Sequence, residues 1–434
     1  MTSFDRIERR MPELMADMAS AGVPDYFDSM LTQAAATRQR PAWASLERWL
    51  PMGVNARIDS LRSPSLRPML ILAVLGLLMI AALAVAAIAS RPEETVPVPA
   101  PFGPAANGAM FYHDANGVIS SADPTTGTST EILRGSGAYE YPLPSRDGQR
   151  IAFEQTQLGV TQLFVADVDG SNMQVLDGQY AGLFEKDWSG DGRQLAILSM
   201  VDAVPTLSIL EADGSGSRTV DIDREVSTFW YQPDGGFVVK ASEQPGGTCR
   251  PDVPSLCGLF VIDATGQEVR QILPEADFAG LSIDPAPDGR SVLYVRWTDA
   301  EPGRLHIVDT ATGEDRAVAV SNMDPAGQEN VNNAWFSPDG TKILFDRFEV
   351  DGEHWAVVPA AGGEAINIGP KWPLAGDGGA TEAAWSPDGR SILARYRGAD
   401  GSDAFWLLDP TGAGDDRQLT LPASQLPTWQ RLAP

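Results

Sequence analysis

Cysteine and histidine are scarce in this 434-residue chain. It holds two cysteines, Cys249 and Cys257, and three histidines, His113, His306 and His354. A protein zinc site needs several Cys or His ligands close together, and the repeat pattern described below puts the three histidines on three different units. We therefore expect no bound metal and no cofactor.

Basic residues are also few. The chain has 32 Lys and Arg against 58 Asp and Glu, a formal net charge of −26. The imbalance lies after residue 68, where 23 basic residues stand against 50 acidic ones. Contact with nucleic-acid phosphates needs a basic face, so we expect no nucleic-acid partner. The excess of acid is explained either by solubility or by cationic partners.

Recognisable catalytic motifs are missing as well. The chain has no Gly-x-Ser-x-Gly elbow, so we expect no serine hydrolase domain beside or after the repeats. The stretch Asp167-Val-Asp-Gly-Ser-Asn172 has some of the oxygen ligands of a calcium loop. It lacks the terminal Glu and the full spacing of such a loop, so we interpret it as a turn.

One pentapeptide pattern occurs six times after residue 140 and always ends in Asp-Gly. Its copies are Pro144-Ser-Arg-Asp147-Gly148, Trp188-Ser-Gly-Asp191-Gly192, Tyr231-Gln-Pro-Asp234-Gly235, Pro285-Ala-Pro-Asp288-Gly289, Phe336-Ser-Pro-Asp339-Gly340 and Trp385-Ser-Pro-Asp388-Gly389. Successive Asp residues lie 43 to 54 positions apart. Such a period is typical of a stacked or radial repeat fold.

Each repeat unit is expected to contain four short strands. In residues 333–368, an apolar run at 334–336 precedes the turn Ser337-Pro-Asp-Gly340. In that turn Pro presets φ, Asp caps its own backbone and Gly takes a positive φ. Three runs rich in β-forming residues follow at 342–348, 354–358 and 365–368. Four antiparallel strands with turns between them describe one blade of a β-propeller.

The two ends of the repeat region complete one more blade. Residues 109–133 hold three strands without a first one, and Leu426-Pro-Thr-Trp429 looks like a lone first strand. Their pairing would close a ring and leave no exposed sheet edge. We therefore predict an all-β fold, a seven-bladed β-propeller, with six blades as the alternative. The tryptophans of the first strands are expected in the core between blades: Trp188, Trp230, Trp335, Trp385 and Trp429.

The pattern aromatic-Ser-Pro-Asp-Gly-x-x-Ile/Leu resembles the repeat of TolB-like (WD40-like) propeller proteins. Residues 336–344 and 385–393 match it best, and the resemblance covers roughly residues 107–431. The first three copies depart from it, since Ser145-Arg146 lacks the proline. The resemblance implies the fold. It does not choose a function, because such propellers include binding modules, peptidase lids and enzymes.

Residues 69–90 form a run of 22 residues without a charge. As a helix the run is about 33 Å long, enough to span a bilayer. Arginines precede it and two glutamates follow it, so the positive-inside rule puts the N-terminus in the cytoplasm. We predict a cytoplasmic helical leader (1–68), a transmembrane helix (69–90), a Pro-rich linker (91–106) and an extracytoplasmic propeller (107–434), held at the plasma membrane.

The cysteines Cys249 and Cys257 lie eight positions apart in one polar loop of the part assigned to the outside of the cell. Extracellular cysteines so close in the sequence favour a disulfide that pins the loop. Free thiols are the alternative.

The leader carries apolar residues at helical spacing, among them Phe4, Ile7 and Met11. A helical cytoplasmic region, one span and an outer sensor is the layout of membrane anti-sigma factors. The stretches 5–14, 23–28 and 38–43 resemble leaders of bacterial proteins of that type. The resemblance implies a cytoplasmic sigma factor as partner, although the leader lacks the His and Cys of the zinc-containing family. The alternative is a leader that only anchors the chain at the membrane.

Two functions remain open from the sequence. The first is a non-catalytic outer propeller that binds an extracytoplasmic protein or ligand and signals inward through the leader. The second is an extracytoplasmic hydrolase or lyase that uses pore-lining carboxylates, with the leader as an anchor. Because no catalytic set is recognisable, we favour the first and predict that the protein is not an enzyme.

Overall fold

The computed structural model describes residues 100–433 apart from short gaps. The gaps are 136, 177, 179, 181, 203, 245–246, 248, 250–256, 275–281, 298–302, 325–328, 373–378, 399 and 415. The chain divides into two compact units, Met1–Thr95 and Val96–Pro434, and only the second contains described residues. The expected leader, the apolar run 69–90 and most of the linker lie outside them. Within the described residues, no helix is long and apolar enough to cross a membrane.

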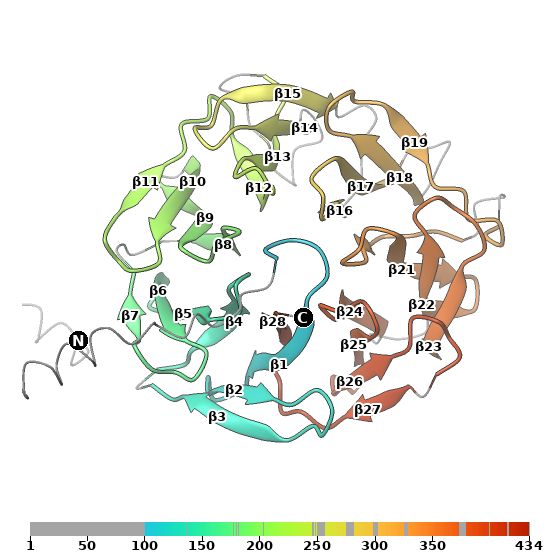
Figure 1. The fold of residues 1–434 in the computed structure, drawn as a ribbon, viewed down its shortest axis with the longest axis horizontal. Helices are drawn as coiled ribbons and strands as arrows, with labels where there is room; N and C mark the ends of the chain where they lie inside the picture. Colours follow the sequence, from blue (N-terminus) through green and yellow to red (C-terminus); the bar gives the residue numbers. More distant parts are fainter. Residues whose placement is uncertain are drawn as a thin grey trace, which may run out of the picture. The chain divides into compact units, whose positions relative to one another are not determined.

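Seven four-stranded antiparallel sheets form a ring (Figure 1). Blade 1 consists of β28 (Thr428–Leu432), β1 (Ala106–His113), β2 (Ile119–Ala122) and β3 (Ser129–Leu133). Blade 2 consists of β4 (Glu140–Pro144), β5 (Arg150–Gln157), β6 (Val160–Asp167) and β7 (Gln174–Val175). Blade 3 consists of β8 (Leu183–Trp188), β9 (Gln194–Val201), β10 (Val204–Glu211) and β11 (Ser217–Thr219). Blade 4 consists of β12 (Val226–Tyr231), β13 (Phe237–Ser242), β14 (Cys257–Ile262) and β15 (Glu268–Leu273).

The remaining three blades follow the same order. Blade 5 consists of β16 (Ile283–Pro285), β17 (Ser291–Arg296), β18 (Arg304–Asp309) and β19 (Asp315–Ala317). Blade 6 consists of β20 (Ala334–Phe336), β21 (Lys342–Glu349), β22 (Gly352–Pro359) and β23 (Ile366–Trp372). Blade 7 consists of β24 (Gly379–Trp385), β25 (Ile392–Arg397), β26 (Asp403–Leu408) and β27 (Arg417–Leu419). The prediction of seven blades is confirmed, and the alternative of six is wrong.

The ring is closed by strands from opposite ends of the described chain. β28 pairs with β1 in an antiparallel register that sets Trp429 opposite Met110 and Thr428 opposite Phe111. The closing strand begins at Thr428, two residues later than the sequence predicted, and continues to Leu432. Since β28 is the innermost strand of blade 1, the last strand of the chain completes the blade that the first three began.

The core lies between neighbouring blades. The middle strands β5, β9, β13, β17, β21 and β25 each carry at least three consecutive apolar residues that are fully buried, because blades cover both of their faces. Trp188 packs between blades 2 and 3, and Trp385 packs between blades 6 and 7. Both are buried, in keeping with the core position expected for these tryptophans.

The six Asp-Gly turns join the innermost strand to the second strand in blades 2 to 7. Their glycines, at 148, 192, 235, 289, 340 and 389, all have a positive φ between 68° and 88°. In each turn the Asp carboxylate accepts a hydrogen bond from the backbone N–H two residues later, at 2.9–3.1 Å. The ring therefore has two ends. We call the end that carries these turns the turn end, and the end where the innermost strands begin the entry end.

A strap formed by residues 100–105 crosses the turn end. In Figure 1 it is the blue segment that lies over the centre of the ring before β1 begins. The N–H of Ala105 donates to the carbonyl of Pro387 in the turn of blade 7, at 2.9 Å. The Arg431 guanidinium donates to the carbonyls of Ala100 and Gly103, at 2.8 and 2.7 Å. The strap is thus tied to blade 7 and to the closing strand.

Candidate functional site

A pocket of about 760 Å³ lies along the axis of the ring, between the innermost strands of blades 2, 3 and 4 and the closing strand. We call it the axial pocket. Its lining residues are Tyr141, Pro142, Leu143, Arg146, Glu154, Leu183, Phe184, Glu185, Lys186, Asp187, Phe229, Trp230, Gln425 and Thr428. Half of them lie in the first half of an innermost strand or just before it, so the pocket reaches the entry end, whereas Arg146 lies in the Asp-Gly turn of blade 2. Aromatic rings and charged groups share its wall.

Two ion pairs stand in the pocket wall. The Lys186 ammonium is almost enclosed and pairs with the Glu154 carboxylate of the neighbouring blade. Burial lowers the pKa of Lys186, and the Glu154 charge opposes that shift. The Arg146 guanidinium donates to both oxygens of Asp187, at 2.9 and 2.7 Å, and to the carbonyl of Trp188 at 2.9 Å. Both basic groups of the pocket therefore already have an acidic partner.

Carboxylates of the innermost strands also hold neighbouring blades together. An innermost strand is the edge of its sheet, and the N–H groups on its unpaired side need acceptors. Asp187 accepts from the N–H of Tyr231 at 3.3 Å, and Asp284 accepts from the N–H of Phe336 at 2.6 Å. Glu382 accepts from the N–H of Leu426 at 3.2 Å. The acidic residues around the axis thus have a structural role before any ligand is considered.

Glu185 belongs to this set and differs in one respect. It accepts hydrogen bonds from the Thr228 hydroxyl at 2.5 Å and from the N–H of Phe229 at 3.1 Å. Desolvation in the pocket wall raises the pKa of Glu185 above its ordinary value, although these two hydrogen bonds favour the carboxylate. Within the part of the chain that the structure describes, no basic side chain forms an ion pair with it.

Tyr141 stands at the pocket with an unusual backbone. Its φ is 52°, a left-handed conformation that costs an aromatic residue free energy, and its side chain is half exposed. Its N–H donates to Nδ1 of the buried His113 at 3.0 Å, so that nitrogen carries no proton. Burial lowers the pKa of His113, because desolvation disfavours the imidazolium. A neutral histidine therefore holds Tyr141 in place.

Arg146 connects the pocket to the strap. Its guanidinium carbon lies 4.4 Å from the centre of the Phe102 ring, a cation–π contact. At the neighbouring turn, a Cβ on Gly190 would lie 3.1 Å from Pro101 and 3.3 Å from Phe102. The glycine leaves the space in which the strap lies.

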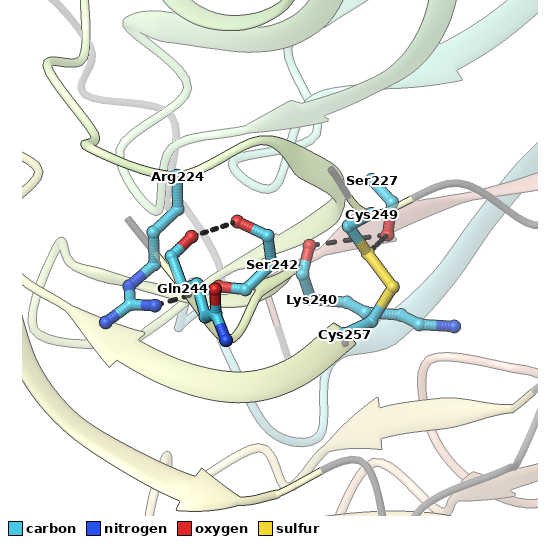
Figure 2. The surroundings of a disulfide bond; sticks show 7 residues. All are labelled: Arg224, Ser227, Lys240, Ser242, Gln244, Cys249 and Cys257. Atoms are coloured by element: carbon cyan, nitrogen blue, oxygen red, sulfur yellow. Dashed lines mark hydrogen bonds between the residues drawn. A yellow bond between two sulfur atoms is a disulfide. The ribbon is translucent and has the colours of Figure 1, made fainter. Parts of the chain in front are cut away.

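The disulfide lies at the entry end of blade 4, in the loop between β13 and β14 (Figure 2). Cys249 and Cys257 have Cα atoms 5.2 Å apart, and Sγ of Cys249 lies 3.3 Å from the Ser227 hydroxyl of β12. The Arg224 guanidinium donates to the carbonyl of Ser242 at 2.9 Å and stacks 4.4 Å from the centre of the Phe260 ring. The predicted disulfide is present, and it anchors this loop beside the strand that carries Trp230.

The residues expected from the sequence and the pocket residues lie largely apart. The twelve Asp and Gly residues of the repeated turns lie at the turn end, whereas the cysteines lie at the entry end. Sequence reasoning missed Arg146, Glu185 and Lys186. A signal for Arg146 was available, because it stands where the best copies of the repeat have proline. Among the described residues, no cluster of three potential metal ligands is present.

Comparisons with known proteins show the fold and no family. No family model matches the sequence, and no curated protein matches it. The β-propeller domain of the Trilobed protease from Pyrococcus furiosus is similar over 74% of this chain and 98% of that one, with 16% identity and a TM-score of 0.52. That domain is described as having an open velcro topology, whereas β28 and β1 pair in the present ring.

Two further solved structures have the same kind of fold. Acylaminoacyl peptidase shares 15% identity, with a TM-score of 0.50 over 74% of this chain and 53% of that one. TolB from Acinetobacter baumannii shares 14% identity, with a TM-score of 0.45 over 74% of this chain and 82% of that one. TolB proteins are thus among the structural neighbours, as the repeat suggested, but at this similarity they carry no argument.

The prediction that the protein is not an enzyme must be corrected. Acylaminoacyl peptidase, whose structure contains a similar propeller, is an enzyme. The prediction rested on the absence of a familiar motif, and a fold shared with enzymes removes that ground. At 15% identity the likeness shows the fold alone, so it assigns no activity to this chain.

Proposed function

We propose that the chain is a single-pass membrane protein whose extracytoplasmic propeller binds a ligand or a protein in the axial pocket. The observation that carries the proposal is the pocket itself. Its volume of about 760 Å³ falls in the range of ligand sites, and convergent polar groups and aromatic rings line it. The strap lies across the turn end, so a ligand approaches from the entry end.

The membrane part of the proposal is supported by the sequence. The uncharged run 69–90 and its flanking charges favour one span with the propeller outside. The disulfide between Cys249 and Cys257 is in keeping with an oxidising compartment. In intact cells, alkylation of the cysteines is expected only after reduction, and protease is expected to spare residues 1–68.

We further propose that the leader binds a cytoplasmic sigma factor and that the propeller regulates this contact. Its support is that residues 3–50 carry at least two apolar helical faces, with too few residues to bury them against each other. Pull-down of the full chain from membranes, compared with a chain lacking residues 1–50, tests this. Recovery of the same proteins by both chains would leave the leader as an anchor.

Binding at the pocket is tested by photo-crosslinking in intact cells. A photoreactive residue at Phe184, at the pocket, is expected to form a defined adduct. The same residue at Arg193, on the exposed turn of blade 3, serves as the control and is expected to form none. Equal labelling at both positions, or none at Phe184, would contradict the pocket as the binding site.

A second candidate is an enzyme of the pocket, and one observation favours it. Desolvation raises the pKa of Glu185. Asp187, two residues further along β8, forms an ion pair with Arg146. Two carboxylates in such different environments are the usual arrangement for an acid and its charged neighbour. Turnover of a panel of esters, peptide amides and oligosaccharides that is lost in Glu185→Gln would support it. Turnover unchanged in that variant would exclude Glu185 as the acid.

A further inference from the structure

Apolar side chains are exposed around the axial pocket at the entry end. Leu158 and Val160 belong to the hairpin between β5 and β6, and Val201 and Val204 belong to the hairpin between β9 and β10. Both hairpin tips lie at the entry end, because their strands run back from the Asp-Gly turns. Phe184, in the pocket wall, is exposed as well. Exposed apolar residues grouped on one face mark interaction surfaces.

Leu158 breaks two local rules at once. The hairpin has a two-residue loop, Leu158-Gly159, between the paired residues Gln157 and Val160. Both loop residues have a positive φ, 52° and 78°, the pattern of a type I′ turn. That turn favours Asn, Asp or Gly, whereas leucine pays a steric cost there. The leucine side chain is also fully exposed, at 104%. A residue that costs stability and buries nothing is expected at a functional position.

The charge of the pocket indicates what would enter it. Lys186 and Arg146 are paired with Glu154 and Asp187, whereas Glu185 accepts two hydrogen bonds and no described basic residue pairs with it. A carboxylate has about four acceptor positions, so Glu185 retains capacity for a further donor. The part of the chain after residue 68 is strongly acidic. A partner with a positive group therefore complements the pocket.

We propose that the entry end of blades 2 and 3 docks a polypeptide partner, which places a basic side chain beside Glu185 and apolar side chains on Leu158, Val204 and Phe184. The proposal rests on the pocket binding proposed above and names the class of partner. A polypeptide fits because the hairpin tips lie outside the pocket, where a small ligand held inside would leave them uncovered. An anionic lipid surface is disfavoured by the acidic charge.

The test uses the purified full chain in detergent and a displayed library of random peptides as the probe. Selected peptides are expected to combine Arg or Lys with apolar neighbours. Replacing their basic residue by citrulline, which keeps the shape of arginine without its charge, is expected to weaken binding about tenfold in fluorescence anisotropy.

Two variants of the chain separate docking from folding. Leu158→Asn places the favoured Asn-Gly pair in the type I′ turn, so the melting temperature is expected to hold or rise while peptide binding falls about tenfold. Glu185→Gln keeps an acceptor for Thr228 and removes the charge, with a similar loss of binding. Val350→Asn is the matched control, because Val350 is an exposed apolar residue at the β21–β22 hairpin of blade 6, away from the pocket. It is expected to change nothing.

The outcomes distinguish this proposal from the proposed function. Selected peptides that are uncharged or acidic, or that bind Leu158→Asn as tightly as the wild type, would overturn the docking surface. The same holds if no peptide is selected, or if a small amine binds with sensitivity to Glu185→Gln alone. In that last case the axial pocket would remain a ligand site. Failure of the Phe184 crosslink removes the pocket, whatever the peptides do.

Discussion

Blades 2 and 3 have the same strands and turns as blades 6 and 7 but differ from them at the proline position of the repeat. Blades 6 and 7 have Ser-Pro-Asp-Gly, with Pro338 and Pro387. Blade 2 has Arg146 and blade 3 has Gly190 at the place of the proline, and both turns keep a glycine at positive φ. In place of the proline, Arg146 pairs with Asp187 and contacts the ring of Phe102, and Gly190 leaves room for the strap. The shared residues build the ring, whereas the departures from them serve the pocket at Arg146 and the strap at Gly190.

The largest effect is expected from breaking the closure on which all blades depend. A chain that stops after Ala423 lacks β28, so β1 becomes an open edge. We expect a loss of about 5 kcal/mol or more, the order of the total stability of a domain, and no cooperative thermal transition. A chain shortened only by residues 433–434 is the control. A similar melting temperature for both chains would contradict the role of the closing strand.

The next effect concerns the loop of blade 4. Cys249→Ser with Cys257→Ser opens the cross-link of a short loop, which lowers the free energy of unfolding by about 2.5 kcal/mol in the chain-entropy model. Urea titration measures it, and reduction of the wild type is expected to give the same loss. A double variant as stable as the oxidised wild type would mean that the loop is held by other contacts.

Asp284, on the innermost strand of blade 5, is a carboxylate that does not line the axial pocket, and its protonation gives the next prediction. Desolvation raises the pKa of Asp284 to about 7 from 3.8. Its contribution to stability is present below pH 3.8 and is lost as the pH rises toward 7, because only the unfolded chain ionises in that window. The free energy of unfolding of Asp284→Asn is therefore expected to exceed that of the wild type by about 2 kcal/mol at pH 8 and by less at pH 5.

The control for Asp284 has the opposite sign. The Ser215 hydroxyl lowers the pKa of the exposed Asp213, so its contribution is present above pH 3.8 and is lost as the pH falls. Asp213→Asn is expected to be slightly less stable than the wild type at pH 8. Melting temperatures of both variants at pH 5 and pH 8 test this difference in sign. Parallel trends in the two variants would refute the assignment to Asp284.

The smallest effect comes from restoring the repeat in blade 2. Arg146→Pro suits the turn but leaves Asp187 in the pocket wall without its guanidinium, at a cost of about 1–2 kcal/mol. Pro338→Ala, in a turn away from the axial pocket, is expected to cost about 0.5 kcal/mol through the unfolded chain. Equal losses in the two variants would mean that Arg146 serves the turn rather than the pocket.

The fold followed from the sequence because each turn is specified locally. An Asp that caps its own backbone and a Gly with positive φ act within five residues, so the six copies counted six blades, and the strands left over at the two ends gave the seventh. The start of β28 at Thr428 rather than Leu426 depends on its register with β1, which is not local.

The pocket did not follow from the sequence, because its residues make contacts between blades and not within one turn. Glu185 and Thr228 meet across blades although 43 positions separate them. Which positions of an innermost strand face the axis is fixed only once the ring has closed. The departures from the repeat, Arg146 above all, were readable, but their partners were not.

The strap determines how the ring would carry mechanical load. A pull on the chain ahead of residue 100 does not reach β1 directly. Three contacts hold the strap ahead of β1. The Arg146 guanidinium contacts the ring of Phe102, and the Arg431 guanidinium donates to the carbonyls of Ala100 and Gly103. The carbonyl of Pro387 accepts from the N–H of Ala105. Tension is thus divided among blades 2, 1 and 7, and the share taken by Arg431 acts on the closing strand β28 itself. Two arginine side chains and one backbone hydrogen bond therefore hold the strap to the ring in parallel, ahead of the covalent link into β1.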